Sequence, residues 1–172
     1  MRSVGGTLVL GGTRSGKSSF AESLLAGLGK PDYLATLGFD PTDVDALARV
    51  ASHRDRRANS FETRELSVPA ELLRFIKGTT KPFLLDSIGT FISSSLSRNV
   101  DLDSELVEEL SHKGQKFVVV SEEVGLSVHP ESKIGRIFID RMGAINQKLA
   151  LALDCVYFVH AGIPVLLRGT DG

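Results

Sequence analysis

The sequence predicts a single α/β domain like that of P-loop NTPases, with a mainly parallel sheet flanked by helices. Strand-like apolar runs alternate with helical patterns along the chain, as in successive βαβ units. A glycine-rich loop follows the first strand-like run and precedes the first helical one. A length of 172 residues suits one domain, and no repeat or linker interrupts the pattern. We therefore expect residues 1–172 to form one nucleotide-binding catalytic domain.

Short β-type apolar runs predict the strands. These runs are Thr7–Leu10, Asp32–Thr36, Phe83–Asp86, Lys116–Ser121, Cys155–His160 and Ile163–Leu167, with Phe61–Leu66 as one further short strand. The last strand follows a tight turn at residues 161–164, so we expect it to run antiparallel to its predecessor. In a sheet of this kind, ligands bind at the carboxyl ends of the parallel strands.

Apolar residues at helical spacing predict the helices. The predicted helices are Lys17–Leu28, Val44–His53, Pro69–Ile76, Ile88–Ser97, Ser104–Leu110 and Ser132–Leu153. The last is the clearest, because its apolar residues recur at steps of three and four over its whole length.

The glycine-rich loop fits the phosphate-binding pattern G-x-x-x-x-G-K-[ST] without a mismatch. Its residues are Gly11, Gly12, Thr13, Arg14, Ser15, Gly16, Lys17 and Ser18. Glycines allow backbone N–H groups to turn toward phosphate oxygens, and the following helix adds its positive N-terminus. Lys17 can reach the β- and γ-phosphates, and the Ser18 hydroxyl can bind Mg²⁺. The simpler alternative is a glycine-rich turn that carries a lysine by chance.

Two further candidates accompany this loop. Asp86 ends an apolar strand, the pattern that holds Mg²⁺ in P-loop proteins, although it could instead cap the next helix, as Ser87 could. His53 lies in a run of arginines, whose charge favours its neutral, nucleophilic form and could bind a triphosphate. A histidine in such a run is also commonly a solvated surface residue.

Composition limits the classes of partner. The chain has 20 Lys and Arg against 21 Asp and Glu, a net charge of −1, which argues against a nucleic-acid or anionic-membrane surface. No apolar run approaches the length of a membrane span. The single cysteine, Cys155, excludes an internal disulfide and fits a cytoplasmic location. It lies in an apolar strand, so we expect a buried, inert thiol.

Eight short motifs occur in order along the chain. They are G-G-x-R-S-G-K-S at 11–18, Y-L-A-T at 33–36, R-V-x-x-H-R-x-R-R at 49–57, T-x-E at 63–65, E-V-G at 123–125, G-R-x-F-x-D at 135–140, G-x-x-N-Q at 143–147 and A-G-I-P at 161–164. In these motifs the chain resembles, over nearly its whole length, the bifunctional adenosylcobinamide kinase/adenosylcobinamide-phosphate guanylyltransferases of cobalamin biosynthesis.

The resemblance implies two reactions. His53 would attack the α-phosphate of GTP, release pyrophosphate and pass GMP to adenosylcobinamide phosphate. The same protein would phosphorylate adenosylcobinamide with ATP or GTP, with Lys17 as a catalytic residue and Mg²⁺ at Ser18 and Asp86. Glu65 would bind the guanine base or the ribose of GTP. Besides the loop at 11–18, the resemblance implies nucleotide binding by Thr36, Leu37, Gly38, Arg54, Asp55, Arg56, Arg57, Glu65 and Asp86. It also implies a homo-oligomer, namely a trimer.

The chain departs from the family pattern at four positions. Ala58, Phe61, Glu122 and Ile139 stand where the family usually has Pro, Trp, Asn and Arg. Two alternatives therefore stay open, a kinase of another small alcohol or nucleotide and a nucleotide-binding regulatory module. A covalent label from α-labelled GTP separates the bifunctional enzyme from both alternatives. Turnover with a panel of hydroxyl acceptors separates the two alternatives from each other.

Overall fold

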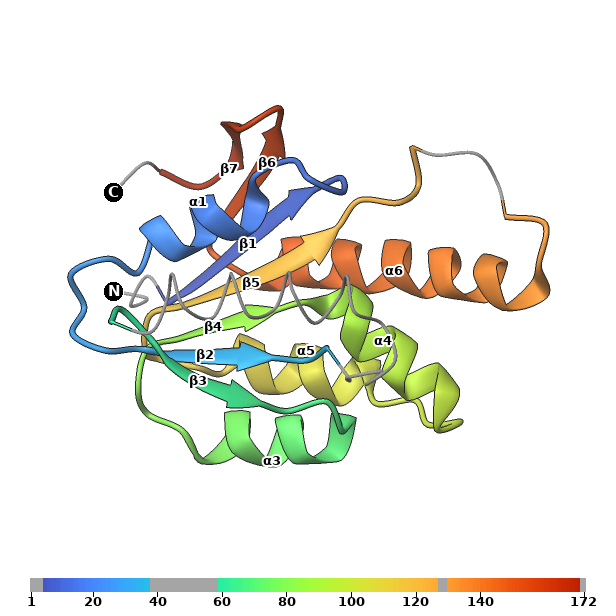
Figure 1. Cartoon of the computed structure of the whole chain (residues 1–172), viewed down its shortest axis with the longest axis horizontal. Helices are drawn as coiled ribbons and strands as arrows, with labels where there is room; N and C mark the ends of the chain where they lie inside the picture. Colours follow the sequence, from blue (N-terminus) through green and yellow to red (C-terminus); the bar gives the residue numbers. More distant parts are fainter. Residues whose placement is uncertain (1–4, 38–58, 127–129, 171–172) are drawn as a thin grey trace.

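All the strands that the structure describes belong to one sheet (Figure 1). The computed structural model describes residues 5–37, 59–126 and 130–170. The strands are β1 Gly6–Gly11, β2 Asp32–Ala35, β3 Glu62–Glu65, β4 Phe83–Asp86, β5 Phe117–Glu122, β6 Cys155–His160 and β7 Ile163–Arg168. The helices are α1 Lys17–Ser23, α3 Pro69–Gly78, α4 Ile88–Ser97, α5 Asp103–Ser111 and α6 Lys133–Ala152.

The strand order is β3-β2-β4-β5-β1-β6-β7, and every pair is parallel except β6 with β7. This arrangement confirms the predicted parallel sheet with a final antiparallel strand. The carboxyl ends of the parallel strands meet at one edge, on the right in Figure 1. Because β5 lies between β1 and β4, the strand that leads into the P-loop has β5 and β6 as its neighbours.

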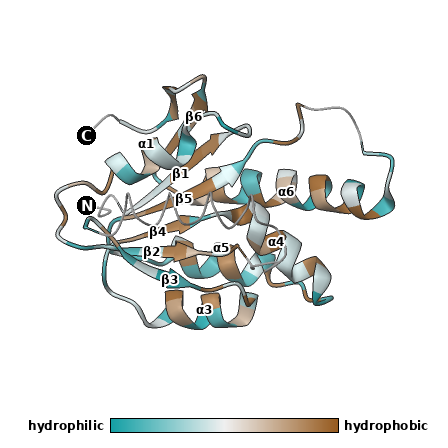
Figure 2. Ribbon diagram, in the orientation of Figure 1, coloured by the Kyte–Doolittle hydropathy of each residue, from teal (hydrophilic) through white to brown (hydrophobic). Residues whose placement is uncertain are grey.

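Helices pack on both faces of the sheet. Buried residues of α3, α4, α5 and α6 form one core with the strands, and α1 contributes to a second core on the opposite face. The central strands are apolar on both faces, as buried parallel strands are, and Val118, Val119 and Val120 of β5 are fully buried. Figure 2 shows the hydrophobic colouring along these strands and on the inward sides of the helices.

Local sequence signals explain where helices begin. Pro69 is the first residue of α3, where its missing N–H costs nothing. The Ser132 hydroxyl accepts a hydrogen bond from the Gly135 N–H at 3.1 Å and caps α6. Ser87 and Thr90 form a capping box at α4. The sequence left Asp86 and Ser87 as alternative caps for the helix that follows β4. In the structure, Ser87 is the N-cap of this helix, α4.

The predicted first helix is too long, since α1 ends at Ser23 rather than Leu28. Beyond that point, backbone N–H groups bond three residues back instead of four, as in Leu25 to Glu22 at 3.2 Å. Gly27 and Gly29 have φ of 80° and 79°, which a helix cannot continue through. The helix predicted at 44–53 lies outside the described residues. Among the residues described, no helix is long and apolar enough to cross a bilayer.

Candidate active site

The loop between β1 and α1 has the backbone geometry of a phosphate-binding loop. Arg14 and Gly16 have positive φ values of 57° and 91°, so the chain turns sharply before the helix. The first turn of α1 closes when the Phe20 N–H donates to the Gly16 carbonyl at 3.0 Å. The Lys17 Nζ donates to the Gly12 carbonyl at 3.3 Å, so the ammonium group lies over the loop. Residues 11–18 are thus brought together as the sequence predicted, at the N-terminus of a helix.

A second turn supports this loop from the far end of the chain. The Gly162 N–H, between β6 and β7, donates to the Ser15 carbonyl at 2.8 Å. A Cβ on Gly11 would lie 2.5 Å from the Ser15 Oγ and 2.7 Å from the Val159 carbonyl oxygen, so only glycine fits there. The Ser15 Oγ is buried and makes no hydrogen bond among the described residues. Such a hydroxyl inside a phosphate loop suits a ligand oxygen.

Asp86 ends β4 on the α1 side of the sheet. Its register partner Val120 belongs to the core beneath α1, and paired residues share a face. The buried Tyr33 donates its hydroxyl to Asp86 Oδ2. Strand β5 lies between β4, which carries Asp86, and the P-loop strand β1. The spacing of motifs along the chain does not give strand order, so this position of β5 could not be predicted.

Thr36 has a positional role that the motif did not reveal. Its side chain is 1% exposed, and its hydroxyl bonds both the N–H and the carbonyl of Ser87 at 2.8 Å. Thr36 therefore joins the end of β2 to the start of α4. Leu37, the next residue, is 41% exposed at the ligand edge.

Two acids that the sequence motifs did not place lie at the end of β5, beside the end of the P-loop strand. Glu122 is the register partner of Gly11, and the Glu123 N–H donates to the Gly11 carbonyl at 3.1 Å. The Glu122 Oε2 accepts a hydrogen bond from the Gly89 N–H at 2.9 Å, at the positive end of α4. A Cβ on Gly89 would lie 2.4 Å from that oxygen, so glycine makes room for the carboxylate.

Of the remaining predicted site residues, the structure describes one, Glu65. Glu65 is exposed at the end of β3, the outermost strand, with β2, β4 and β5 between it and β1. Outside the described residues lie Gly38, His53, Arg54, Asp55, Arg56 and Arg57.

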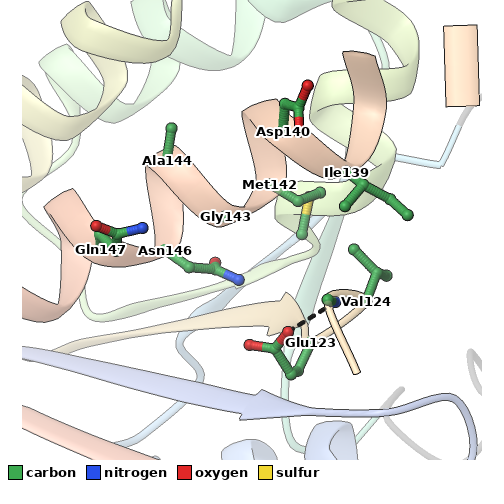
Figure 3. A pocket seen from close by; sticks show the side chains of 10 residues that line it. Glu123, Val124, Ile139, Asp140, Met142, Gly143, Ala144, Asn146 and Gln147 are labelled. Carbon is green, nitrogen blue, oxygen red and sulfur yellow. Dashed lines mark hydrogen bonds between the residues drawn. The ribbon is translucent and has the colours of Figure 1, made fainter. Parts of the chain in front are cut away.

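A cavity of about 360 Å³ opens between the end of β5 and α6. Figure 3 shows Met142 and Ile139 of α6 on the side that faces Glu123 and Val124. The cavity is lined by Glu123, Val124, Gly125, Ile139, Asp140, Met142, Gly143, Ala144, Asn146 and Gln147. All of these residues except Met142 come from three of the motifs described above, which the sequence alone did not join into one site.

Comparisons with known proteins point to the same family as the sequence motifs. A model of the family described as cobinamide kinase / cobinamide phosphate guanyltransferase matches residues 7–167. The chain is 33% identical over 169 residues to the bifunctional adenosylcobalamin biosynthesis protein CobP of Pseudomonas aeruginosa, covering 94% of this chain and 96% of that protein. It is 31% identical over 182 residues to the bifunctional adenosylcobalamin biosynthesis protein CobU of Salmonella typhimurium. That match covers 94% of this chain and 98% of CobU.

A solved structure supports the fold independently. The flagellar accessory protein FlaH of Methanocaldococcus jannaschii superposes with a TM-score of 0.53, covering 99% of this chain and 80% of FlaH. At 11% identity, this likeness concerns the fold alone. The family match spans nearly the whole chain and includes the P-loop, so the chain belongs to the cobinamide kinase / cobinamide phosphate guanyltransferase family.

Proposed function

We propose that this protein phosphorylates cobinamide with a nucleoside triphosphate and then transfers GMP from GTP to cobinamide phosphate. The observation that carries the proposal is a complete P-loop at the ligand edge of a chain that matches this family over residues 7–167. The substrates are small molecules, namely ATP or GTP and a corrinoid alcohol, in its adenosylated form by resemblance.

In the first reaction, the P-loop holds the triphosphate and the acceptor hydroxyl oxygen attacks the γ-phosphorus. The bond between that phosphorus and the β–γ bridging oxygen breaks, and a nucleoside diphosphate leaves. Backbone N–H groups at the start of α1 and the Lys17 ammonium stabilise the negative charge on the transferred group. Lys17 already lies over the loop, at 3.3 Å from the Gly12 carbonyl.

Ser18 and Asp86 are the residues that would hold Mg²⁺ at this site. Their chemistry fits, because Mg²⁺ takes one or two protein oxygens together with phosphate oxygens and water. In the described part of the chain, no group of three or more His, Cys, Asp or Glu forms a cage for a metal. When bound, the ion would neutralise charge on the β- and γ-phosphate oxygens.

In the second reaction, a His53 ring nitrogen attacks the α-phosphorus of GTP and pyrophosphate leaves. The resulting phosphoramidate is then attacked by a phosphate oxygen of cobinamide phosphate, which takes GMP and releases the histidine. A nucleophile of this kind must be unprotonated near neutral pH, which suits imidazole.

Substitution of His53 tests the two-reaction proposal. In His53→Ala, the GMP adduct and GMP transfer should be lost, while cobinamide phosphorylation should persist with a raised KM for nucleotide. Intact-mass spectrometry after GTP incubation detects the adduct, which should be labile in acid and stable in base. His112→Ala, at an exposed histidine, is the matched control. Wild-type protein that transfers GMP without any adduct would show direct attack by the substrate instead.

A further inference from the structure

We infer that the cavity between the end of β5 and α6 binds the alcohol that accepts the phosphoryl group, and that Glu123 receives its proton. This inference rests on the proposed kinase activity. It assigns a place to the second substrate, while the P-loop takes the first.

One end of the cavity lies next to the strand that leads into the P-loop. Glu123 follows the last residue of β5, and its N–H donates to the Gly11 carbonyl at 3.1 Å. Neighbouring strands lie about 4.8 Å apart. A hydroxyl held next to Glu123 would therefore lie at the same sheet edge as the loop that binds the phosphates, where an attacking oxygen must be placed.

The lining selects a neutral, partly apolar ligand. Two acids, Glu123 and Asp140, line the cavity, and none of its ten residues is Lys, Arg or His. This charge disfavours a triphosphate and suits a ligand that donates hydrogen bonds from hydroxyl or amide groups. Met142, Ile139 and Val124 provide apolar contact. A volume of about 360 Å³ accommodates the hydroxyl-bearing arm of a large acceptor rather than all of it.

The Glu123 carboxylate is oriented by the backbone. Its Oε1 accepts the Gly125 N–H at 2.8 Å, the dashed line in Figure 3. A carboxylate has about four acceptor positions, so others remain for a hydroxyl. The acceptor O–H would donate to Glu123, the oxygen would bond to the γ-phosphorus, and the proton would pass to the carboxylate and then to water.

The α6 wall of the cavity is fixed before any ligand binds. Asn146 accepts the Ser121 hydroxyl at 2.6 Å and donates to the Glu122 carbonyl at 3.0 Å. On the other side of α6, Arg141 donates to both carboxylate oxygens of Asp103 at 2.9 and 2.5 Å. Hydrogen bonding to Asp103 raises the pKa of Arg141, so the guanidinium keeps its charge. A preformed wall lowers the entropy that binding costs.

The same charges would help release the product. Phosphorylation converts a neutral hydroxyl into an anionic monoester, which Glu123 and Asp140 disfavour. The product would therefore leave this cavity for the guanylyl-transfer site, rather than remain and inhibit.

Substitution of Gly143 tests the binding claim. Gly143 lines the cavity, and a Cβ there meets no atom within 4 Å, so the helix tolerates a side chain that takes up cavity space. Gly143→Leu should raise the KM for cobinamide at least tenfold, and Gly143→Ala should raise it less. The KM for nucleotide and the GMP adduct should not change, which also shows that the fold is intact. Gly78→Leu, at another open helix position, is the matched control.

Glu123→Gln tests the proton claim. The kcat for cobinamide phosphorylation should fall about a hundredfold, the lower range for a general base, with little change in either KM. The GMP adduct should form at the normal rate. An unchanged cobinamide KM in Gly143→Leu, or an unchanged kcat in Glu123→Gln, overturns this inference while wild-type activity stands. Wild-type protein that does not phosphorylate cobinamide overturns the proposed function itself.

Discussion

At the residue scale, Lys17 lies where it can act on a bound triphosphate. It is the first residue of α1, and its Nζ reaches back to the Gly12 carbonyl. Its charge would then lie over phosphate oxygens held by the loop, in a setting where fixed charges stabilise a transition state strongly.

We expect Lys17→Ala to abolish both reactions, because both use a triphosphate. Loss of one preorganised donor typically costs about 10²–10³ in kcat, and the loss here should reach at least that. Steady-state rates of phosphorylation and GMP transfer measure it. Lys30→Ala, at an exposed lysine, should leave both rates unchanged. Full activity of Lys17→Ala would remove the P-loop lysine from the mechanism.

Asp86 shows how a buried neighbour can orient an acid. We expect Asp86→Asn to weaken Mg²⁺-dependent nucleotide binding without unfolding the protein, since Ser87 rather than Asp86 caps α4. Tyr33→Phe keeps the carboxylate but removes its donor, so its effect should be smaller and in the same direction. Nucleotide affinity titrated against Mg²⁺, together with urea unfolding, checks both variants. Identical Mg²⁺ titrations in wild type and Asp86→Asn would leave Asp86 a structural partner of Tyr33.

At the element scale, a buried amide joins α6 to β5. Asn146 bonds the Ser121 hydroxyl and the Glu122 carbonyl, and it is only 7% exposed. This link fixes the helix that forms one wall of the cavity against the strand that forms the other.

We expect Asn146→Ala to lower the free energy of unfolding by about 1–3 kcal/mol, because the buried Ser121 hydroxyl and the partly buried Glu122 carbonyl lose their hydrogen bonds. Gln147→Ala changes the adjacent, exposed amide and should stay within about 0.5 kcal/mol of wild type. Urea unfolding of both variants measures the difference. Equal stability of the two variants would show that water replaces the Asn146 contacts.

The elements themselves were largely predictable, because apolar periodicity and helix caps act locally. The strands and the α6 helix lie within a residue or two of their predicted bounds. The burial of Cys155 was also predicted. The early end of α1 depends on the φ values of Gly27 and Gly29, which the helical pattern did not reveal. Strand order, and with it the place of Glu122 next to Gly11, depends on pairing between distant segments.

At the scale of the whole molecule, the candidate site combines one local part with several distant ones. The P-loop could be predicted because its residues are consecutive. The contact of Tyr33 with Asp86 and the cavity between Glu123 and α6 could not, since folding alone brings these segments together. The placement of His53 relative to this loop stays a prediction.

Self-association also stays a prediction. Three apolar side chains of the edge strand β7 are exposed. The exposed fractions are 65% for Ile163, 48% for Val165 and 60% for Leu167. Edge strands with exposed apolar side chains are usually covered in the working protein. We expect the 18.5 kDa chain to sediment as a homo-oligomer, and as a trimer by resemblance. Sedimentation equilibrium across a range of concentrations measures this directly, and a monomer throughout would contradict it.

The support that Gly162 gives to Ser15 sets an order of events during synthesis. The ribosome makes residues 11–18 early, but β1 acquires its two neighbours only when residues 117–122 and 155–160 have emerged. The bond between Gly162 and Ser15 must form later still. A nascent chain therefore carries the nucleotide-binding motif before the segments that support it, and the loop is complete only after residue 162 has emerged and bonded to Ser15.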